Sequence, residues 1–166
     1  TEVYGGPILN TWFDRPLSLA GRVSIDSGNP LQPETKLINC KDPLMVIPNL
    51  AIHMNRKVNE GVELNKQKDV LPFLTMVEDN FEKDDFLINI IGDKLEVNYE
   101  DIVDFDLFLY ETEDGQLSGL NKEFISAGRQ DDLAMAQAGL KALTETEAVD
   151  ATNLLVLFDN EEVGSS

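Results

Sequence analysis

Two adjacent carboxylates, Glu161 and Glu162, stand just after the apolar run Leu154–Phe158. Charge beside an apolar strand is costly unless something compensates it, and a bound cation is a common compensator. In open α/β sheets, ligands bind at the carboxyl ends of the strands, where this pair would lie. Neighbouring side chains diverge there, so one glutamate could hold a metal while the other faces a substrate. The alternative is that both glutamates open a solvated helix or loop.

A second acidic pair, Asp131 and Asp132, stands where the loop after Gly128 is predicted to become a helix. Aspartate is a favoured N-cap and suits the positive end of the helix dipole, which is one explanation of the pair. The other is that Asp131 reaches a metal beside Glu161 and Glu162, because both sites are junctions of one predicted sheet. Three or four carboxylates suit a divalent-cation cluster, in which one carboxylate bridges two ions and a glutamate activates water.

The single histidine, His53, is flanked by Ile52 and Met54, and burial with a hydrogen bond is the commoner outcome in such a setting. Zinc sites usually use more imidazole than one histidine supplies, so further zinc ligands would have to come from outside these residues. The segment 12–15, Trp-Phe-Asp-Arg, predicts aromatic core packing with a local ion pair. Motifs for a serine nucleophile, a phosphate loop, a dinucleotide fold or a redox cysteine pair are absent from the sequence.

The elements before residue 70 are predicted to be β-rich. Residues 17–25 alternate between apolar and small or polar side chains, which predicts a half-buried strand. The short runs 36–40 and 44–47 predict two further strands. Residues 49–69 are polar and without a clear period, so they are predicted to be mostly loop.

Helical spacing follows in the middle of the chain. The apolar residues of 71–81 recur at intervals of three and four residues, and Pro72 stands where a helix would start, so a helix is predicted. Those of 86–95 do the same, and a hairpin that turns at Gly92-Asp93 is the competing interpretation. Asn98 is typical of the cap of a short turn.

The last 60 residues predict a strand at 105–110, an extended segment at 124–126, a helix at 132–144 and a strand at 153–158. This order of strand, helix and strand indicates a piece of an α/β sheet. Together with the β-rich first part, the predicted fold class is α/β, of the α+β kind.

The composition excludes several classes of function. The formal net charge is -18, from 31 acidic and 13 basic residues, so binding to nucleic acid or to an anionic membrane is not expected. No stretch approaches the roughly 18 apolar residues of a spanning helix, and no secretory signal pattern is present. Cys40 is the only cysteine, which favours the reducing cytoplasm.

The two ends of the chain are unusual. Thr1 has no methionine before it, and Ser166 comes soon after the Glu161–Glu162 pair. We therefore expect a fragment of a longer protein.

Several segments, in order along nearly the whole chain, resemble the aspartyl aminopeptidases of the M18 metallopeptidase family. They are Thr1–Gly6, Thr11–Val23, Ile47–Arg56, Asp104–Tyr110, Phe124–Ala127 and Phe158–Ser165. The resemblance implies an enzyme that removes acidic residues from peptide N-termini with two divalent ions, zinc first and manganese or cobalt as alternatives.

The resemblance also implies roles for single residues. Asp131 would bridge both metals, Glu162 would be a metal ligand and Glu161 the general base. His53 would belong to a dimerisation domain and reach the active site of a neighbouring subunit. The family implies a dimer-based homo-oligomer, with a dodecamer as a candidate size. Asp132 departs from the family, which usually has asparagine there.

We therefore predict an inserted, β-rich dimerisation domain in residues 1–110 and part of an α/β catalytic domain in residues 111–166. The upstream His-Thr-Asp motif of the family and its downstream Asp and His ligands are absent, so the isolated chain is predicted to be inactive. An M42-like aminopeptidase of other specificity and a non-catalytic oligomerisation module are the alternatives.

Overall fold

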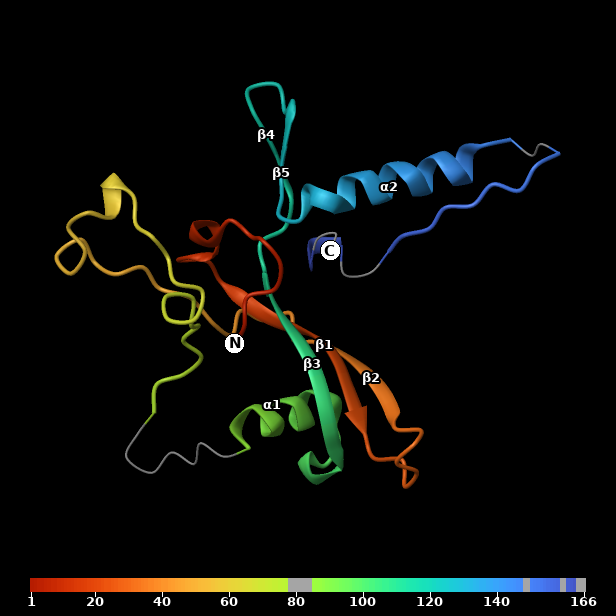
Figure 1. Cartoon of the computed structure of the whole chain (residues 1–166), viewed down its shortest axis with the longest axis horizontal. Coiled ribbons are helices and arrows are strands. Elements are labelled where there is room, and N and C mark those ends of the chain that lie inside the picture. The colour runs from red at the N-terminus through yellow and green to blue at the C-terminus, as the bar shows by residue number, and fades with distance from the viewer. Residues whose placement is uncertain (78–84, 148–149, 159–160, 164–166) are drawn as a thin grey trace. The chain divides into compact units, whose positions relative to one another are not determined.

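A computed structural model describes residues 1–77, 85–147, 150–158 and 161–163. Helices and antiparallel sheets occur together, which confirms the predicted α/β class (Figure 1). The chain divides into two compact units: Thr1–Glu2 with Ile8–Thr112 form the first, and Val3–Pro7 with Glu113–Ser166 form the second. No helix of the described residues is long and apolar enough to cross a membrane.

An antiparallel sheet of three strands organises the first unit, in the order β2-β1-β3. Its strands are β1 (Leu17–Ile25), β2 (Glu34–Asn39) and β3 (Ile102–Glu111). The register pairs Ala20 with Asn39 on one side and Leu19 with Leu109 on the other. The alternation of residues 17–25 thus correctly predicted the central strand, and the predictions for β2 and β3 are confirmed within a few residues.

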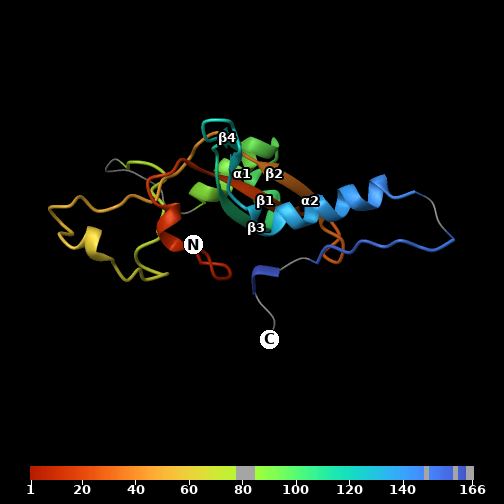
Figure 2. The ribbon, with the colours of Figure 1, turned by 90° about the horizontal axis from the view of Figure 1, so that it is seen from above.

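The core lies between one face of this sheet and helix α1 (Phe86–Leu95), which crosses it in both views (Figures 1 and 2). Val23 of β1 is fully buried, and Ile38 of β2 and Ile91 of α1 are nearly so. Burying a side chain of this size contributes about 1.5–3 kcal/mol. The sheet face selects the helix over the competing hairpin, because a helix places Leu87 and Ile91, four positions apart, on the same side toward the core.

Short 3-10 turns complete the first unit. The 3-10 helix Tyr99–Asp101 follows Asn98 at the predicted place, but the Asn98 side chain does not cap its backbone and donates instead to the Asp101 carboxylate at 3.3 Å. Two further 3-10 turns are Leu9–Trp12 and Val58–Glu60. The predicted loop over 49–69 is confirmed apart from the second of these turns.

Two predictions between β2 and α1 need correction. Residues 44–47 form isolated bridges instead of a strand, with Met45 paired to Leu17 and Val46 paired to Phe73. The helix predicted over 71–81 is wrong for 71–77, and the rest of it lies outside the described residues. Phe73 donates its N–H to the carbonyl of Val46 at 2.7 Å and accepts from its N–H at 3.1 Å, so a tertiary pairing prevailed over the apolar spacing.

The second unit contains a hairpin and one long helix. Strands β4 (Gln116–Ser118) and β5 (Phe124–Ser126) pair antiparallel and lead into α2 (Gln130–Glu145). The strand predicted at 153–158 is wrong, because no described segment pairs with these residues. Leu155 instead lies beside Gly139 of α2, where an added Cβ would stand 3.0 Å from a Leu155 methyl.

Candidate active site

Asp131 lies at the entrance of α2. Its φ of -87° and ψ of 114° are not helical, so the regular helix begins only after it. Gln130 donates from its side-chain amide to the carbonyls of Ile125 and Ala127, at 3.2 and 3.3 Å, which ties this entrance to the end of β5. The short hairpin and this amide therefore set the position of the Asp131 backbone.

The backbone of Asp131 is that of an N-cap residue, so the capping explanation stays open beside the metal one. Arg129, at the formal start of α2, makes no side-chain hydrogen bond that caps the helix. Asp131 and Asp132 are both exposed in the first turn, where their charge still complements the helix dipole. The carboxylate of Asp131 thus points into solvent-accessible space, as an available metal ligand would.

Glu161 and Glu162 lie in a 3-10 turn that spans Glu161–Val163. Glu161 is exposed, and the side chain of Glu162 lies outside the described part of the chain. Both follow the extended residues 152–158. The pair is thus carried by a turn at the end of an apolar segment that lacks strand partners in the described ranges.

The candidate metal ligands do not form a complete metal site among the described residues. Within those ranges, no group of three or more His, Cys, Asp or Glu side chains gathers as a metal site would require. Carboxylates are a type of ligand that divalent cations bind. A zinc site uses three or four protein ligands, however, so Asp131 and Glu161–Glu162 fit such an ion only together with further donors.

His53 lies in the first unit, on an exposed turn. The N–H groups of Met54 and Asn55 both donate to the carbonyl of Ala51, at 2.8 and 3.1 Å, which closes the turn around the histidine. Ile52 is 52% exposed and Met54 is 74% exposed, so the expected burial of His53 is wrong. Its imidazole is presented outward, where it is accessible to another molecule.

The carboxylate of Asp14 makes a contact that sequence reasoning missed. One of its oxygens accepts from the backbone N–H of Asn49 at 2.9 Å, and the other accepts from the Asn49 side-chain amide at 2.8 Å. Both bonds lower the pKa of Asp14, and the bond from the backbone N–H has the larger effect. The partner stands 35 residues away, so no local pattern could have revealed it. The aromatic neighbours Trp12 and Phe13 are half-buried.

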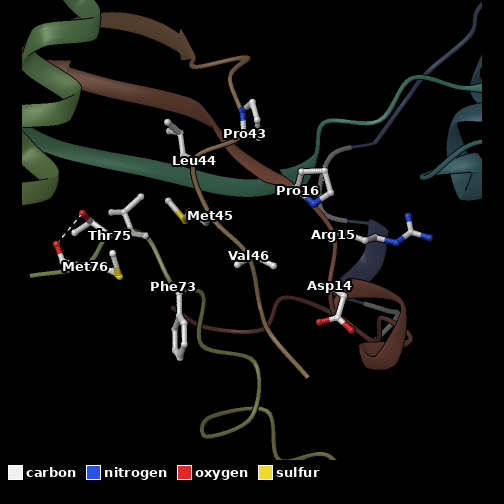
Figure 3. A pocket seen from close by; sticks show the side chains of 11 residues that line it. Asp14, Arg15, Pro16, Pro43, Leu44, Met45, Val46, Phe73, Thr75 and Met76 are labelled. Carbon is white, nitrogen blue, oxygen red and sulfur yellow. Dashed lines mark hydrogen bonds between the residues drawn. The ribbon is translucent and has the colours of Figure 1, made fainter. Parts of the chain in front are cut away.

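A groove of about 490 Å³ lies beside Asp14 in the first unit. It is lined by Asp14–Pro16, Pro43–Val46 and Phe73–Met76 (Figure 3). None of the four predicted site residues lines it. Most of its side chains are apolar, so it offers packing surface and little that could carry out hydrolysis.

The only cysteine is not a candidate nucleophile. Cys40 is 4% exposed and belongs to the core cluster with Val23 and Ile91. Burial is the main cause that raises the pKa of its thiol. Because the thiolate is the nucleophilic form, the environment of Cys40 disfavours nucleophilic attack by its sulfur.

The exposed carboxylates at the entrance of α2 and in the turn Glu161–Val163 are of the ligand type that metal-dependent hydrolases use. The family described as aminopeptidase I zinc metalloprotease (M18) matches residues 1–166. The chain therefore belongs to the M18 family, and the M42 alternative is set aside.

Relatives support the same family. A protein described as probable M18 family aminopeptidase 2 of Clostridium novyi is 59% identical over 166 residues, and one of Clostridium acetobutylicum is 57% identical. Each alignment covers 100% of this chain and 38% of the relative, so the chain spans less than two-fifths of their length.

Solved structures share the fold. The Ape4 and Nbr1 complex contains a chain with a TM-score of 0.73 and 31% identity, covering 86% of this chain and 30% of that one. Chaetomium thermophilum mApe1 has a TM-score of 0.73 and 26% identity, with coverages of 90% and 36%.

Proposed function

We propose that this chain is part of a dinuclear metal-dependent aminopeptidase that removes N-terminal Asp or Glu from peptides. The observation that carries the proposal is the M18 family match over all 166 residues, within which Asp131, Glu161 and Glu162 are all present. Because the chain spans 38% of its curated relatives, the activity is proposed for the longer protein.

In this proposal three carboxylates divide the work. Asp131 and Glu162 would hold the metal ions, with Asp131 shared between two of them, and Glu161 would take a proton from the attacking water and deliver it to the leaving amine. Divalent ions, zinc first and manganese or cobalt as alternatives, would acidify that water and polarise the peptide carbonyl. The exposed position of Asp131 at the entrance of α2 supports its part in this scheme. The remaining ligands would come from outside this chain.

We further propose that residues 1–110 act as a dimerisation domain and that His53 reaches the active site of a neighbouring subunit. Its exposure on the turn at 51–55 supports this role, since a buried imidazole could not reach another chain. The related Saccharomyces cerevisiae mApe1 is described as a dodecamer, which supports a homo-oligomer here. Residues 111–166 would supply part of the catalytic domain, and the protein would work in the cytoplasm.

The test is hydrolysis of Asp-, Glu- and Leu-nitroanilide by the full-length protein, with divalent metal added. We expect cleavage that favours Asp and Glu, and a loss of about 10²–10⁴-fold in kcat for Glu161→Gln, the usual size of a general-base contribution. Glu147→Gln removes another exposed charge of the same unit and should keep wild-type activity.

Each other result decides against part of the proposal. A preference for Leu would contradict the acidic specificity. Full activity of Glu161→Gln would contradict the role of that residue. An absence of cleavage with every substrate and metal would leave the non-catalytic oligomerisation module as the better explanation. The 166-residue chain alone is expected to be inactive under the same conditions.

A further inference from the structure

The segment that carries His53 is an extended loop without a buried residue. Residues 49–69 leave the sheet and return to it, and only three of them are even half-buried: Asn55, Val58 and Leu64 (Figure 1, orange to yellow). A loop of this kind gains little from packing, so the position of His53 depends on the points at which the loop is fixed.

The start of the loop is fixed by backbone pairing. Ile47 is 3% exposed, and its carbonyl accepts from the N–H of Asp14 at 2.9 Å. Phe13 forms a bridge with Ile47, and Val46 is paired with Phe73 on its other side. The chain is therefore held firmly up to Ile47, two residues before the loop begins.

The carboxylate of Asp14 extends this hold onto the loop itself. Asp14 adopts a left-handed backbone conformation with φ of 55°, which aspartate adopts more readily than most residues. Both carboxylate oxygens are then used on Asn49, one by its backbone N–H and one by its side-chain amide. Two bonds to an ionised acceptor restrain both the position and the orientation of Asn49.

This anchor is close to His53, whereas the other end of the loop is far from it. His53 follows Asn49 by four positions, and the hydrogen-bonded turn at 51–55 begins two positions after Asn49. On the other side, Val70, the next buried residue, follows His53 by 17 positions. A displacement of Asn49 is passed on to His53, because the segment between them is short and partly closed by hydrogen bonds. A displacement of Val70 is not, because the segment between them is long and polar. Asp14 is thus well placed to control where the imidazole stands.

We propose that Asp14 is a positioning residue that holds, through its two hydrogen bonds to Asn49, the loop turn that presents His53 to a second copy of the protein. The inference rests on the proposed function, in which His53 contributes to catalysis in a neighbouring subunit. The lowered pKa of Asp14 agrees with it, because the same two hydrogen bonds from Asn49 favour the ionised carboxylate.

The test is a double-mutant cycle in the full-length protein, with kcat and KM for an Asp-nitroanilide measured separately. Asp14→Ala should lower kcat/KM by about 10–100-fold, as expected when a catalytic group is displaced by about 1 Å. In a His53→Ala background the same substitution should have no further effect, because residues that act through one another are not additive. Asp93→Ala, which removes an exposed carboxylate of α1, serves as the control with unchanged kinetics.

An exchanged pair provides a rescue that a structural defect would not show. In Asp14→Asn with Asn49→Asp, the amide oxygen of residue 14 can accept from the backbone N–H of residue 49, and its NH₂ can donate to the new carboxylate. Activity should return to within about threefold of wild type, since both hydrogen bonds are restored. Hydrogen exchange of residues 49–57 should rise in Asp14→Ala and fall back in the exchanged pair.

The outcomes separate this inference from the proposed function. If wild type is active and Glu161→Gln is not, but Asp14→Ala acts equally strongly with and without His53, the positioning role is overturned while the function stands. Unchanged hydrogen exchange of residues 49–57 in Asp14→Ala overturns it as well. If the wild-type protein cleaves nothing, the proposed function fails, and the role of Asp14 in catalysis fails with it.

Discussion

At the scale of single residues, the pair of Asp14 and Asn49 couples protonation to structure. Both hydrogen bonds to the carboxylate favour its ionised form, so the pKa of Asp14 in the folded chain lies below the ordinary 3.8. The unfolded chain then binds the proton more tightly than the folded chain. The contribution of this pair to stability is therefore complete above pH 3.8 and is lost as the pH falls through the folded pKa.

The expected consequence is a difference confined to strong acid. Asp14→Asn should be less stable than wild type at neutral pH, and the two unfolding midpoints should converge as the pH falls below 3.8. Thermal unfolding followed by circular dichroism between pH 2 and 7 measures this directly. A constant difference between the two proteins over the whole range would show that the carboxylate charge is not involved.

At the scale of elements, strands β1 and β3 approach each other closely at Gly21. Gly21 lies opposite Leu107, and an added Cβ would stand 2.1 Å from the carbonyl oxygen of Asp106 and 2.8 Å from the Leu107 Cα. These are backbone atoms of a paired strand, so they cannot move aside as a side chain would. Glycine is thus required where the central strand meets its neighbour.

Gly21→Ala should destabilise the protein by about 2–3 kcal/mol, the upper part of the range for overpacking in a well-packed site. The measurement is the free energy of unfolding in guanidinium chloride. Gly6→Ala is the matched control, because an added Cβ there meets nothing within 4 Å. Equal stability of the two variants would contradict the tight approach of β1 and β3.

At the scale of the whole molecule, the two units differ in how much they bury. Every buried residue of the described ranges belongs to the first unit, from Leu17 to Gly92 along the sequence. In the second unit, Leu133 of α2 is 56% exposed and Leu154 is 81% exposed. Apolar surface of this extent normally contacts further protein. The net charge of -18 works against self-association of such surfaces.

Hydrogen exchange should show this contrast. In the 166-residue chain, we expect strong protection of β1 and α1 and weak protection of α2, because helices without buried contacts open locally. In the full-length protein, α2 should become protected at least tenfold more. Mass spectrometry of the two proteins under identical conditions makes the comparison. Equal protection of α2 in both would show that the second unit is complete without further chain.

Local sequence patterns were sufficient to predict the elements that face the core. The alternation of residues 17–25 and the spacing of 86–95 encode which side of each element is buried, and β1 and α1 formed as predicted. The sequence was also sufficient for the family and for the candidates Asp131, Glu161 and Glu162, because residue types and their order carry that information. The roles of these three residues and of His53 stay predictions.

Only the tertiary structure decided which distant groups meet. Phe73 pairs with Val46 instead of continuing a helix, and Asp14 binds Asn49. Residues 153–158 are apolar enough for a strand, yet they form none in the described chain, since a strand needs a neighbour to complete its hydrogen bonds. Periodicity reports which face of a segment avoids water. It does not report the hydrogen-bond partner, because that partner is selected by the packing of the whole chain.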